Sequence, residues 1–290
     1  MHKTILQFLI VFLAVHTQVF AEESCKQSQN CIDIDRWDLA LAIGLGSRSN
    51  PLSDYENIPV YVVPSIAYYG DNWFFDNGNL GYSLIESERF TINLATTYSD
   101  DSGFFNKWDP SNIFMLANGY QRSSVSASSA QQAEMVDKTI DFDELGDRNF
   151  TMLATIEGFY FSRFGVLKAA IGHDMFNVHN GAQADFKWNY SIAVDNWVFD
   201  TGVSATWKSE DLVDYYYGIR VTENTFWHQQ YRASSAWNFG AELTARYLIA
   251  THWDALLALR YTKFAKAISD SPLLSDDYSS TYFVGMAYRF

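Results

Sequence analysis

The stretch from Trp237 to Ile249 decides the fold, and it reads WNFGAELTARYLI. Its odd-numbered positions carry Trp, Phe, Ala, Leu, Ala, Tyr and Ile, whereas its even-numbered positions begin Asn, Gly, Glu, Thr and Arg. Because successive side chains of a strand point to opposite faces, this alternation predicts a strand with one apolar and one polar face. Strands of soluble proteins average about five or six residues, whereas a tilted strand that crosses a membrane needs about nine to eleven. The length of this stretch therefore favours a membrane-crossing strand.

The same alternation recurs along the chain, at residues 37–47, 90–98, 186–194 and 253–262. Two architectures share it: a soluble sandwich whose bulky faces meet in a core, and a transmembrane barrel whose bulky faces meet lipid. Aromatic residues near the predicted strand ends favour the barrel, because their rings rest at the level of the lipid headgroups. These residues are Trp37, Trp197, Trp207, Trp237, Tyr247, Trp253 and Tyr261. The mean hydropathy of -0.15 agrees with a barrel, since only every second strand residue touches lipid.

We therefore predict an all-β fold, a transmembrane antiparallel β-barrel of about 12 strands that occupies residues 37–290. Strand boundaries read from a sequence are loose by a few residues, so about 10 to 14 strands are compatible with the pattern. The expected strands lie near 37–47, 58–69, 73–85, 88–99, 149–160, 163–172, 183–194, 197–207, 213–220, 235–249, 252–264 and 279–290.

The first 21 residues, 1–21, have the pattern of a secretory signal peptide. Lys3 gives a basic start, residues 5–15 form a short apolar run, and Ala21 supplies the small residue that a signal peptidase requires. The run is too short to span a membrane as a helix. Cleavage is expected between Ala21 and Glu22.

The mature chain is expected to begin with an N-terminal periplasmic tail, residues 22–36. Export implies an oxidising compartment, so Cys25 and Cys31 could close a disulfide within this tail. Two cysteines cannot build a four-thiolate zinc site. Acidic residues outnumber basic ones by 34 to 20, and the net charge of -14 lacks the attraction that nucleic-acid binders use. We therefore expect no nucleic-acid partner and no metal or cofactor.

The chain ends on a complete alternating strand. Its bulky positions are Tyr282, Val284, Met286, Tyr288 and Phe290. A strand with an aromatic carboxy-terminal residue resembles the terminal strand that bacterial outer-membrane proteins present to the barrel-insertion machinery. This predicts a place in the outer membrane of a Gram-negative bacterium, with lipid, lipopolysaccharide and the insertion machinery as partners.

The loops of the predicted barrel are unequal in length. With both termini in the periplasm, residues 48–57, 221–234 and 265–278 are expected to form outer loops. Counting strands from either end then puts a long insertion near 100–148 on the periplasmic side, where turns are usually short. Three interpretations stay open: a periplasmic excursion that meets a partner, a segment folded into the lumen, or an error in the strand count around residues 113–120.

Charged residues on the predicted inward faces would line a polar lumen. They are Asp38, Arg89, Glu242, Arg246, Asp254 and Arg260. If water fills the lumen, charges of both signs predict little ion selectivity, and if the charges pair with one another the lumen is closed. His252 and Asp254 share one face of a strand and could form a proton-transfer pair. No nucleophile elbow or metal-binding histidine spacing accompanies them, so we do not expect an enzyme.

Several short motifs follow one another along the chain. They are Gly44-Leu45-Gly46 with residues 47–51, Pro59 and Pro64, Trp73-Phe74-Phe75, Gly78, Leu80-Gly81-Tyr82, Gly146-Asp147-Arg148, Asp214-Tyr215-Tyr216-Tyr217-Gly218, Asp270-Ser271-Pro272-Leu273 and Gly285-Met286-Ala287-Tyr288-Arg289-Phe290. Their order over essentially the whole mature chain resembles the MipA/OmpV family of outer-membrane proteins. The resemblance implies a scaffold that interacts with the murein hydrolase MltA, or a porin-like or adhesive surface protein. Residues 123–137 depart from the family pattern.

We predict a non-enzymatic barrel that acts as a scaffold for murein hydrolases or synthases on its periplasmic side, a role that rests on the resemblance. A small-solute channel is one alternative. A surface-binding protein is another, and Trp227, Tyr231 and Tyr278 of the outer loops could then serve as aromatic anchors. A lumen hydrolase that uses His252 and Asp254 is a fourth hypothesis.

Overall fold

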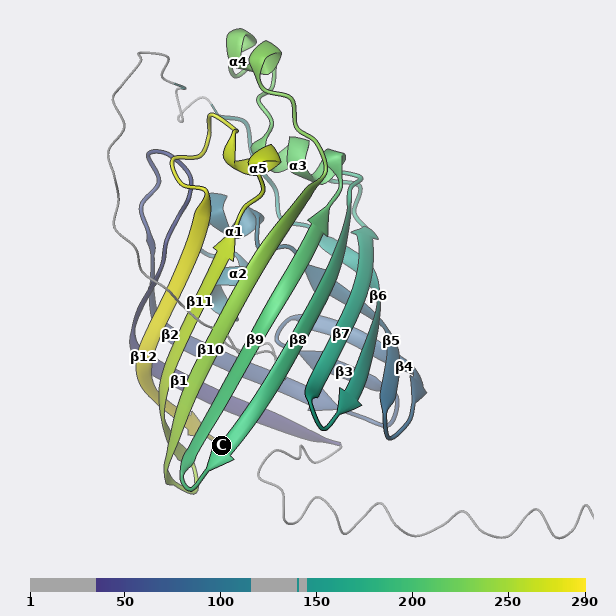
Figure 1. Cartoon of the computed structure of the whole chain (residues 1–290), viewed down its shortest axis with the longest axis vertical. Coiled ribbons are helices and arrows are strands. Elements are labelled where there is room, and N and C mark those ends of the chain that lie inside the picture. The colour runs from purple at the N-terminus through teal and green to yellow at the C-terminus, as the bar shows by residue number, and fades with distance from the viewer. Residues whose placement is uncertain (1–34, 116–139, 141–144) are drawn as a thin grey trace, which may run out of the picture. The chain divides into compact units, whose positions relative to one another are not determined.

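A computed structural model describes residues 35–115, 140 and 145–290 (Figure 1). The signal peptide, its cleavage between Ala21 and Glu22, and the Cys25–Cys31 disulfide lie outside these residues and stay predictions. No helix within the described residues is long and apolar enough to cross a membrane.

Twelve antiparallel strands close into a barrel in which each strand pairs with its neighbours in sequence and β1 pairs with β12. The strands are β1 (Arg36–Arg48), β2 (Ile58–Tyr69), β3 (Trp73–Asp76), β4 (Asn79–Glu86), β5 (Phe90–Tyr98), β6 (Met152–Ser162), β7 (Gly165–Asp174), β8 (Ala182–Val194), β9 (Trp197–Lys208), β10 (Ala236–Ala250), β11 (Trp253–Lys263) and β12 (Tyr278–Arg289). The helices are α1 (Ser102–Phe105), α2 (Pro110–Ile113), α3 (Glu210–Tyr217), α4 (Thr225–Gln230) and α5 (Lys266–Ser269). The prediction of an all-β antiparallel barrel is confirmed.

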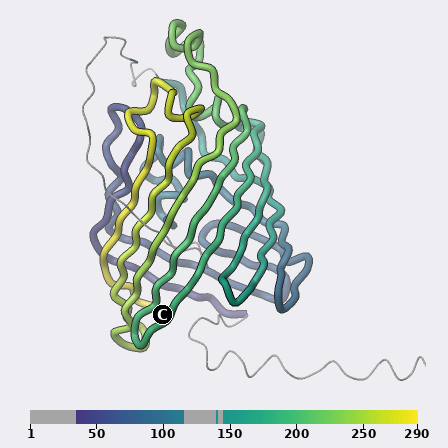
Figure 2. Tube along the Cα trace, in the orientation of Figure 1, coloured from purple at the N-terminus to yellow at the C-terminus, as the bar shows by residue number. Residues whose placement is uncertain are grey.

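The two ends of the barrel differ. Tight reversals join the strands at the end where the C-terminus lies, and longer excursions leave the opposite end (Figure 2). Helices α3, α4 and α5 lie at that opposite end (Figure 1). Bacterial outer-membrane barrels keep short turns in the periplasm and long loops outside, so we name the helical end the outer end. The predicted outer loops 48–57, 221–234 and 265–278 all lie there.

The strand prediction was wrong at two places, and the two errors cancel in the total number of strands. The expected strand 73–85 is broken into β3 and β4 by Asn77 and Gly78, whose φ angles of 51° and 91° form a tight turn. The expected strand 213–220 is instead mostly helix α3, with the Ser209 side chain accepting from the Leu212 N–H at its start. One strand is gained and one lost, so the total stays at twelve. The direction of every strand between them is reversed, so the insertion near 100–148 leaves β5 and enters β6 at the outer end of the barrel and not at the periplasmic end.

The bulky face of each long strand points away from the lumen. On β1, Ile43 and Leu45 are 60% and 66% exposed, whereas Ala42 between neighbouring outward positions is buried. On β10, Phe239 is exposed while Asn238 and Glu242 are buried. Apolar side chains are stable at such exposure where they meet lipid, so the outward faces form the membrane-contacting surface.

A compact apolar core lies at the outer end, and we call it the cap cluster. Helix α3 contributes Leu212, Val213, Tyr216 and Tyr217, all fully buried, and their spacing places them along one helical face. They pack against Leu52, Phe104, Ile140, Ile219, Ala236, Phe264, Ile268 and Leu273. The outer end of the barrel is therefore covered by a packed lid with a core of its own.

Candidate functional site in the barrel lumen

Residues 99–115, which we call the plug segment, fold into the lumen beneath the cap cluster. Arg48, at the outer end of β1, donates to Asn112 Oδ1 (2.7 Å) and to the Asp100 carbonyl oxygen (3.1 Å). Its guanidinium also lies 4.2 Å from the centre of the Phe104 ring. At the other end of the segment, Met115 is buried against the inward side chains of β2. This corrects the periplasmic placement of the insertion and agrees with the alternative of a segment folded into the lumen.

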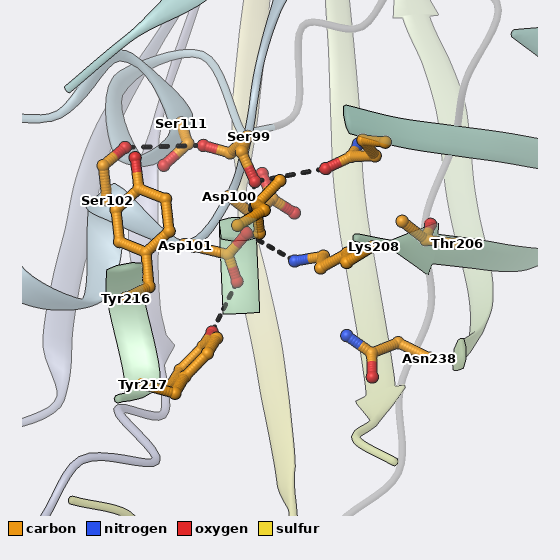
Figure 3. Close-up of polar contacts among 12 residues, drawn as sticks. Ser99, Asp100, Asp101, Ser102, Ser111, Thr206, Lys208, Tyr216, Tyr217 and Asn238 are labelled. Atoms are coloured by element: carbon orange, nitrogen blue, oxygen red, sulfur yellow. Dashed lines mark hydrogen bonds and ion pairs between the residues drawn. The ribbon is translucent and has the colours of Figure 1, made fainter. Parts of the chain in front are cut away.

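Asp101 connects the plug segment to the barrel wall and to the cap cluster (Figure 3). We call Asp101 with its partners Lys208, Tyr217 and Ser99 the Asp101 node. Its Oδ2 lies 2.5 Å from Nζ of Lys208 on β9, and its Oδ1 accepts a hydrogen bond of 2.5 Å from the Tyr217 hydroxyl on α3. Ser99 donates a further hydrogen bond to the same carboxylate. Asp101 is 0% exposed. A single carboxylate thus joins the plug segment to β9 and α3, two elements that follow it by more than a hundred residues.

The charge state of Asp101 follows from two opposed effects. Burial raises the pKa of its carboxyl, but the charge of Lys208 and the hydrogen bonds lower it by more, so the pKa ends below its ordinary value of 3.8. Burial and the neighbouring carboxylate raise the pKa of the Tyr217 hydroxyl well above its ordinary value. At neutral pH the Asp101 carboxylate is therefore ionised, and it accepts hydrogen bonds from Lys208 on one side and from Tyr217 on the other.

Two further ion pairs occupy the middle of the lumen. Lys187 Nζ lies 2.6 Å from Glu242 Oε2, and Lys168 Nζ lies 2.7 Å from Glu157 Oε2. Lys168 and Lys187 stand directly opposite each other on β7 and β8, an arrangement of like charges that normally destabilises a sheet. The carboxylates on β6 and β10 flank the two lysines and offset this repulsion.

The residues predicted to line the lumen divide into two groups. Most of them carry an ion pair: Glu242 pairs with Lys187, Arg260 lies 3.5 Å from Asp100, Arg246 lies 3.8 Å from Asp254, and Asp38 lies 3.6 Å from Arg289. Arg89 does not belong with them, because it is exposed in the turn between β4 and β5 at the periplasmic end. Arg89 immediately precedes β5, so the alternation of that strand was extended one residue too far and wrongly assigned Arg89 to the inward face.

The proposed hydrolytic pair is not assembled. His252 is exposed in the turn between β10 and β11, where its ring stacks on Tyr288 with centroids 5.9 Å apart. Asp254 instead faces Arg246. Within the described residues, no group of three or more His, Cys, Asp and Glu side chains is placed to hold a metal ion.

The aromatic residues suggested as surface anchors are half-buried and packed against other parts of the chain. Trp227 packs against the cap cluster, and the Tyr231 hydroxyl donates to the Ala267 carbonyl oxygen (2.5 Å). Tyr278 stacks on Tyr261 at 5.5 Å between ring centroids. These contacts hold the outer loops in place.

Comparison with known proteins agrees with this architecture. A family model described as MltA-interacting protein MipA matches residues 39–290. The chain belongs to the MipA family. MltA-interacting protein of Escherichia coli (strain K12) is 26% identical over 252 residues, covering 87% of this chain and 90% of that protein. Outer membrane protein OmpV of Vibrio cholerae is 24% identical over 237 residues, covering 78% of this chain and 77% of that protein.

Solved outer-membrane barrels are also similar to the MipA-family chain, at low identity. OmpT, an outer membrane protein of Vibrio cholerae, aligns with 88% of this chain and 97% of its own, with a TM-score of 0.34 and 8% identity. The closed barrel and the relatives named as outer membrane proteins place the chain in the outer membrane of a Gram-negative bacterium.

Several motifs that carry the MipA-family resemblance meet at the cap. Arg148 donates to Glu223 Oε1 (2.8 Å), and the side chains of this pair are 0% and 3% exposed. Burial raises the pKa of the Glu223 carboxyl, but the hydrogen bonds from Arg148 lower it by more, so the net shift is downward. Ser271 donates to the Tyr217 carbonyl oxygen (2.6 Å), and Leu273 is fully buried beside it. These motifs therefore build the lid over the lumen.

A polar cavity of about 180 Å³ remains under the plug segment. Charged side chains of both signs line it, among them Arg48, Lys168, Lys187, Lys208, Arg260, Asp100, Asp101, Asp185 and Glu242. Hydroxyl and amide groups of Ser204, Thr206, Asn238, Ser279 and Thr281 complete the lining. The sequence pattern could have revealed Lys187, which lies on the polar face of its strand, but it contained no signal for Asp101.

Proposed function

We propose that this MipA-family barrel is a scaffold that holds a murein-remodelling enzyme at the periplasmic face of the outer membrane. The observation that carries the proposal is the Asp101 node, which fastens the plug segment to both Lys208 and Tyr217. A barrel whose outer end is filled in this way is better suited to binding a partner protein on its periplasmic surface than to passing solutes through its lumen. The name of the relative MltA-interacting protein supports a murein hydrolase as the partner.

A group of exposed charges at the periplasmic end offers a surface for such a partner, and we call it the rim patch. It comprises Glu86 at the end of β4, Glu88 and Arg89 of the β4–β5 turn, and Arg163 of the β6–β7 turn, all exposed. The two turns are joined by a hydrogen bond of 2.8 Å from the Phe161 N–H to the Arg89 carbonyl oxygen. This bond fixes the relative position of the charges, and fixed charges at an interface speed encounter with a complementary partner.

Reversing the acidic half of the rim patch is expected to weaken enzyme binding. The double variant Glu86→Lys/Glu88→Lys should lower the affinity for a soluble MltA-type murein hydrolase by about tenfold, chiefly by slowing association. Surface plasmon resonance on the barrel in lipid nanodiscs measures both rate constants. The matched control is Glu56→Lys/Asp276→Lys, which makes the same charge change at exposed sites on the outer end. Equal weakening by both variants, or no binding by the wild type, would contradict the scaffold.

The polar cavity favours a second candidate function, a channel for small solutes. If the plug segment stays in place, the refolded chain should insert into planar bilayers and give no steady conductance. Steady conductance steps would favour the channel over the scaffold. In that case Arg260→Glu should shift the selectivity toward cations, because Arg260 lines the cavity. Heat-modifiable migration on gels, measured in parallel, establishes that the tested chain is folded.

A further inference from the structure

One sector of the barrel wall is lower than the rest. Strand β3 pairs with β2 only along residues 67–69, and its turn to β4 at residues 77–78 lies beside Ile66. On the other flank, β4 pairs with β5 only as far as Ala95. Among the described residues, no strand stands between β2 residues 58–65 and the last residues of β5. We call this sector the wall window.

The wall window lies at the depth of the membrane. Tyr68 of β2 stacks on Trp73 at 4.7 Å between ring centroids, which marks the periplasmic aromatic belt. Val62 of β2 stands opposite Ile43 of β1, and both side chains are more than half exposed on the lipid-facing surface. The window therefore opens toward the hydrocarbon layer and not toward water.

The edge of β2 that borders the window is suited to staying unpaired. The Ile66 N–H points toward the β3 side, where it donates to Asn77 Oδ1 (2.8 Å). Residues two apart on a strand point their N–H groups the same way, so Pro64 occupies the next such position. Proline has no N–H, and an unsatisfied N–H in hydrocarbon costs several kcal/mol, so Pro64 removes one of the donors that this edge would otherwise present to the window.

The end of the plug segment fills the window from the inside with apolar side chains. Helix α2 lies against β2, and Met115 packs with Val60 and Val63. The Phe114 ring lies over the β3–β4 turn, where a Cβ added to Gly78 would be 3.6 Å from it. Within the part of the chain that the structure describes, the barrier between the bilayer and the lumen is here a row of side chains and not a hydrogen-bonded wall.

The lumen cavity reaches this barrier at Tyr98. Tyr98 borders both, because it lines the cavity and its hydroxyl donates to the Asn77 carbonyl oxygen in the turn (3.1 Å). Arg48 likewise lines the cavity and holds Asn112 of helix α2. The cavity offers cations and carboxylates side by side, as in the Lys187–Glu242 pair, so it suits a ligand that carries both charges.

We propose that a zwitterionic glycerophospholipid of the bilayer binds here, with its headgroup in the lumen cavity and one acyl chain in the wall window. The phosphate would meet the lysine side of the cavity and the ammonium its carboxylate side. The acyl chain would enter between the side chains that fill the window, and would displace Phe114 and Met115 to reach Val63. This site is separate from the periplasmic rim patch, so the proposal stands or falls independently of the scaffold role.

Photo-crosslinking in vesicles tests the site on the wild-type chain. The probe is phosphatidylethanolamine with a diazirine in one acyl chain, and the crosslinked residues are mapped by peptide mass spectrometry. We expect labels on the inward-facing Val63 and Met115 in addition to the lipid-facing surface. Labelling confined to outward residues such as Tyr61, Val62 and Leu94 would overturn the proposal, because any lipid that surrounds the barrel reaches those.

Two controls distinguish recognition of the lipid headgroup by the cavity from the mere entry of any lipid through the wall window. Phosphatidylglycerol with the same photoactive chain should label the inward residues about tenfold less, the effect of losing one charge-assisted hydrogen bond from the ammonium. Equal inward labelling by both lipids would overturn the assignment of the headgroup. Glu242→Gln should lower inward labelling by phosphatidylethanolamine to a similar extent, while Phe239→Leu, on the outward face of the same strand, should leave it unchanged. The wild-type comparison of the two lipids needs no variant and stays decisive if Glu242→Gln fails to fold.

Discussion

Replacing Lys208 with Met is expected to destabilise the barrel by about 3–5 kcal/mol, because it leaves a buried carboxylate without its cation. Asp101 is 0% exposed, and of its side-chain donors among the described residues Ser99 and Tyr217 would remain. Urea unfolding of the refolded chain in lipid vesicles, followed by tryptophan fluorescence, measures the loss. Because Asp101 holds the plug segment against the wall, the same variant should also give conductance steps in planar bilayers, whereas the wild-type chain is expected to give none.

The matched control is Lys263→Met, which breaks the ion pair between Lys263 and Asp277. Both side chains of that pair are about half exposed, so water screens it and its loss should cost less than about 1 kcal/mol. Adding Asp101→Asn to Lys208→Met removes the stranded charge and should recover part of the stability. A Lys208→Met variant no less stable than Lys263→Met would show that the node does not hold the plug segment.

The strands could be predicted from the sequence because a barrel wall has two unlike environments. Each long strand touches lipid on one face and a polar lumen on the other. Apolar and polar residue types therefore alternate from Trp237 to Ile249. The same logic identifies Glu242 as inward-facing, yet it cannot name Lys187 as its partner, because two different strands supply them. Alternation gives the face of a residue and not its neighbours.

The two errors in the strand prediction had local signals that the alternation masked. Asn77-Gly78 is the residue pair that tight hairpin turns prefer, since both positions need a positive φ. Ser209 followed by Glu210 and Asp211 is a typical helix start, with a capping hydroxyl and acidic residues in the first turn. The tyrosines at 215–217 have strong strand propensity, and burial in the cap overrides it.

The Asp101 node could not be predicted from the sequence by any pattern. Asp101 lies in an irregular segment, and its partners Lys208 and Tyr217 follow more than a hundred residues later. Neither helical nor strand periodicity links such positions, so only the closed barrel brings them together. The wall window has the same origin, because it depends on how far a four-residue strand, β3, reaches along its neighbour.

Gly285→Ala is expected to impair closure of the barrel. Gly285 stands opposite Gly44 where the last strand pairs with the first, and a Cβ on Gly285 would lie 2.3 Å from the Ile43 carbonyl oxygen and 2.7 Å from the Gly44 Cα. Backbone atoms must move apart to admit it, so the substitution should cost about 1–3 kcal/mol or more. The loss falls on the pairing that closes the barrel, so the heat-modifiable folded fraction should drop together with the unfolding midpoint.

Gly158→Ala separates this steric effect from the general effect of adding a methyl group to a strand. A Cβ on Gly158 of β6 would come no closer than 3.8 Å to the Thr91 carbonyl oxygen, so the wall there has room for it. The alanine also restricts the unfolded chain, which makes this variant neutral or slightly stabilising. If Gly285→Ala folds as well as Gly158→Ala, the close approach of β1 and β12 is not needed for closure, and the paired glycines at the seam only relieve crowding around the Phe283 ring in the lumen.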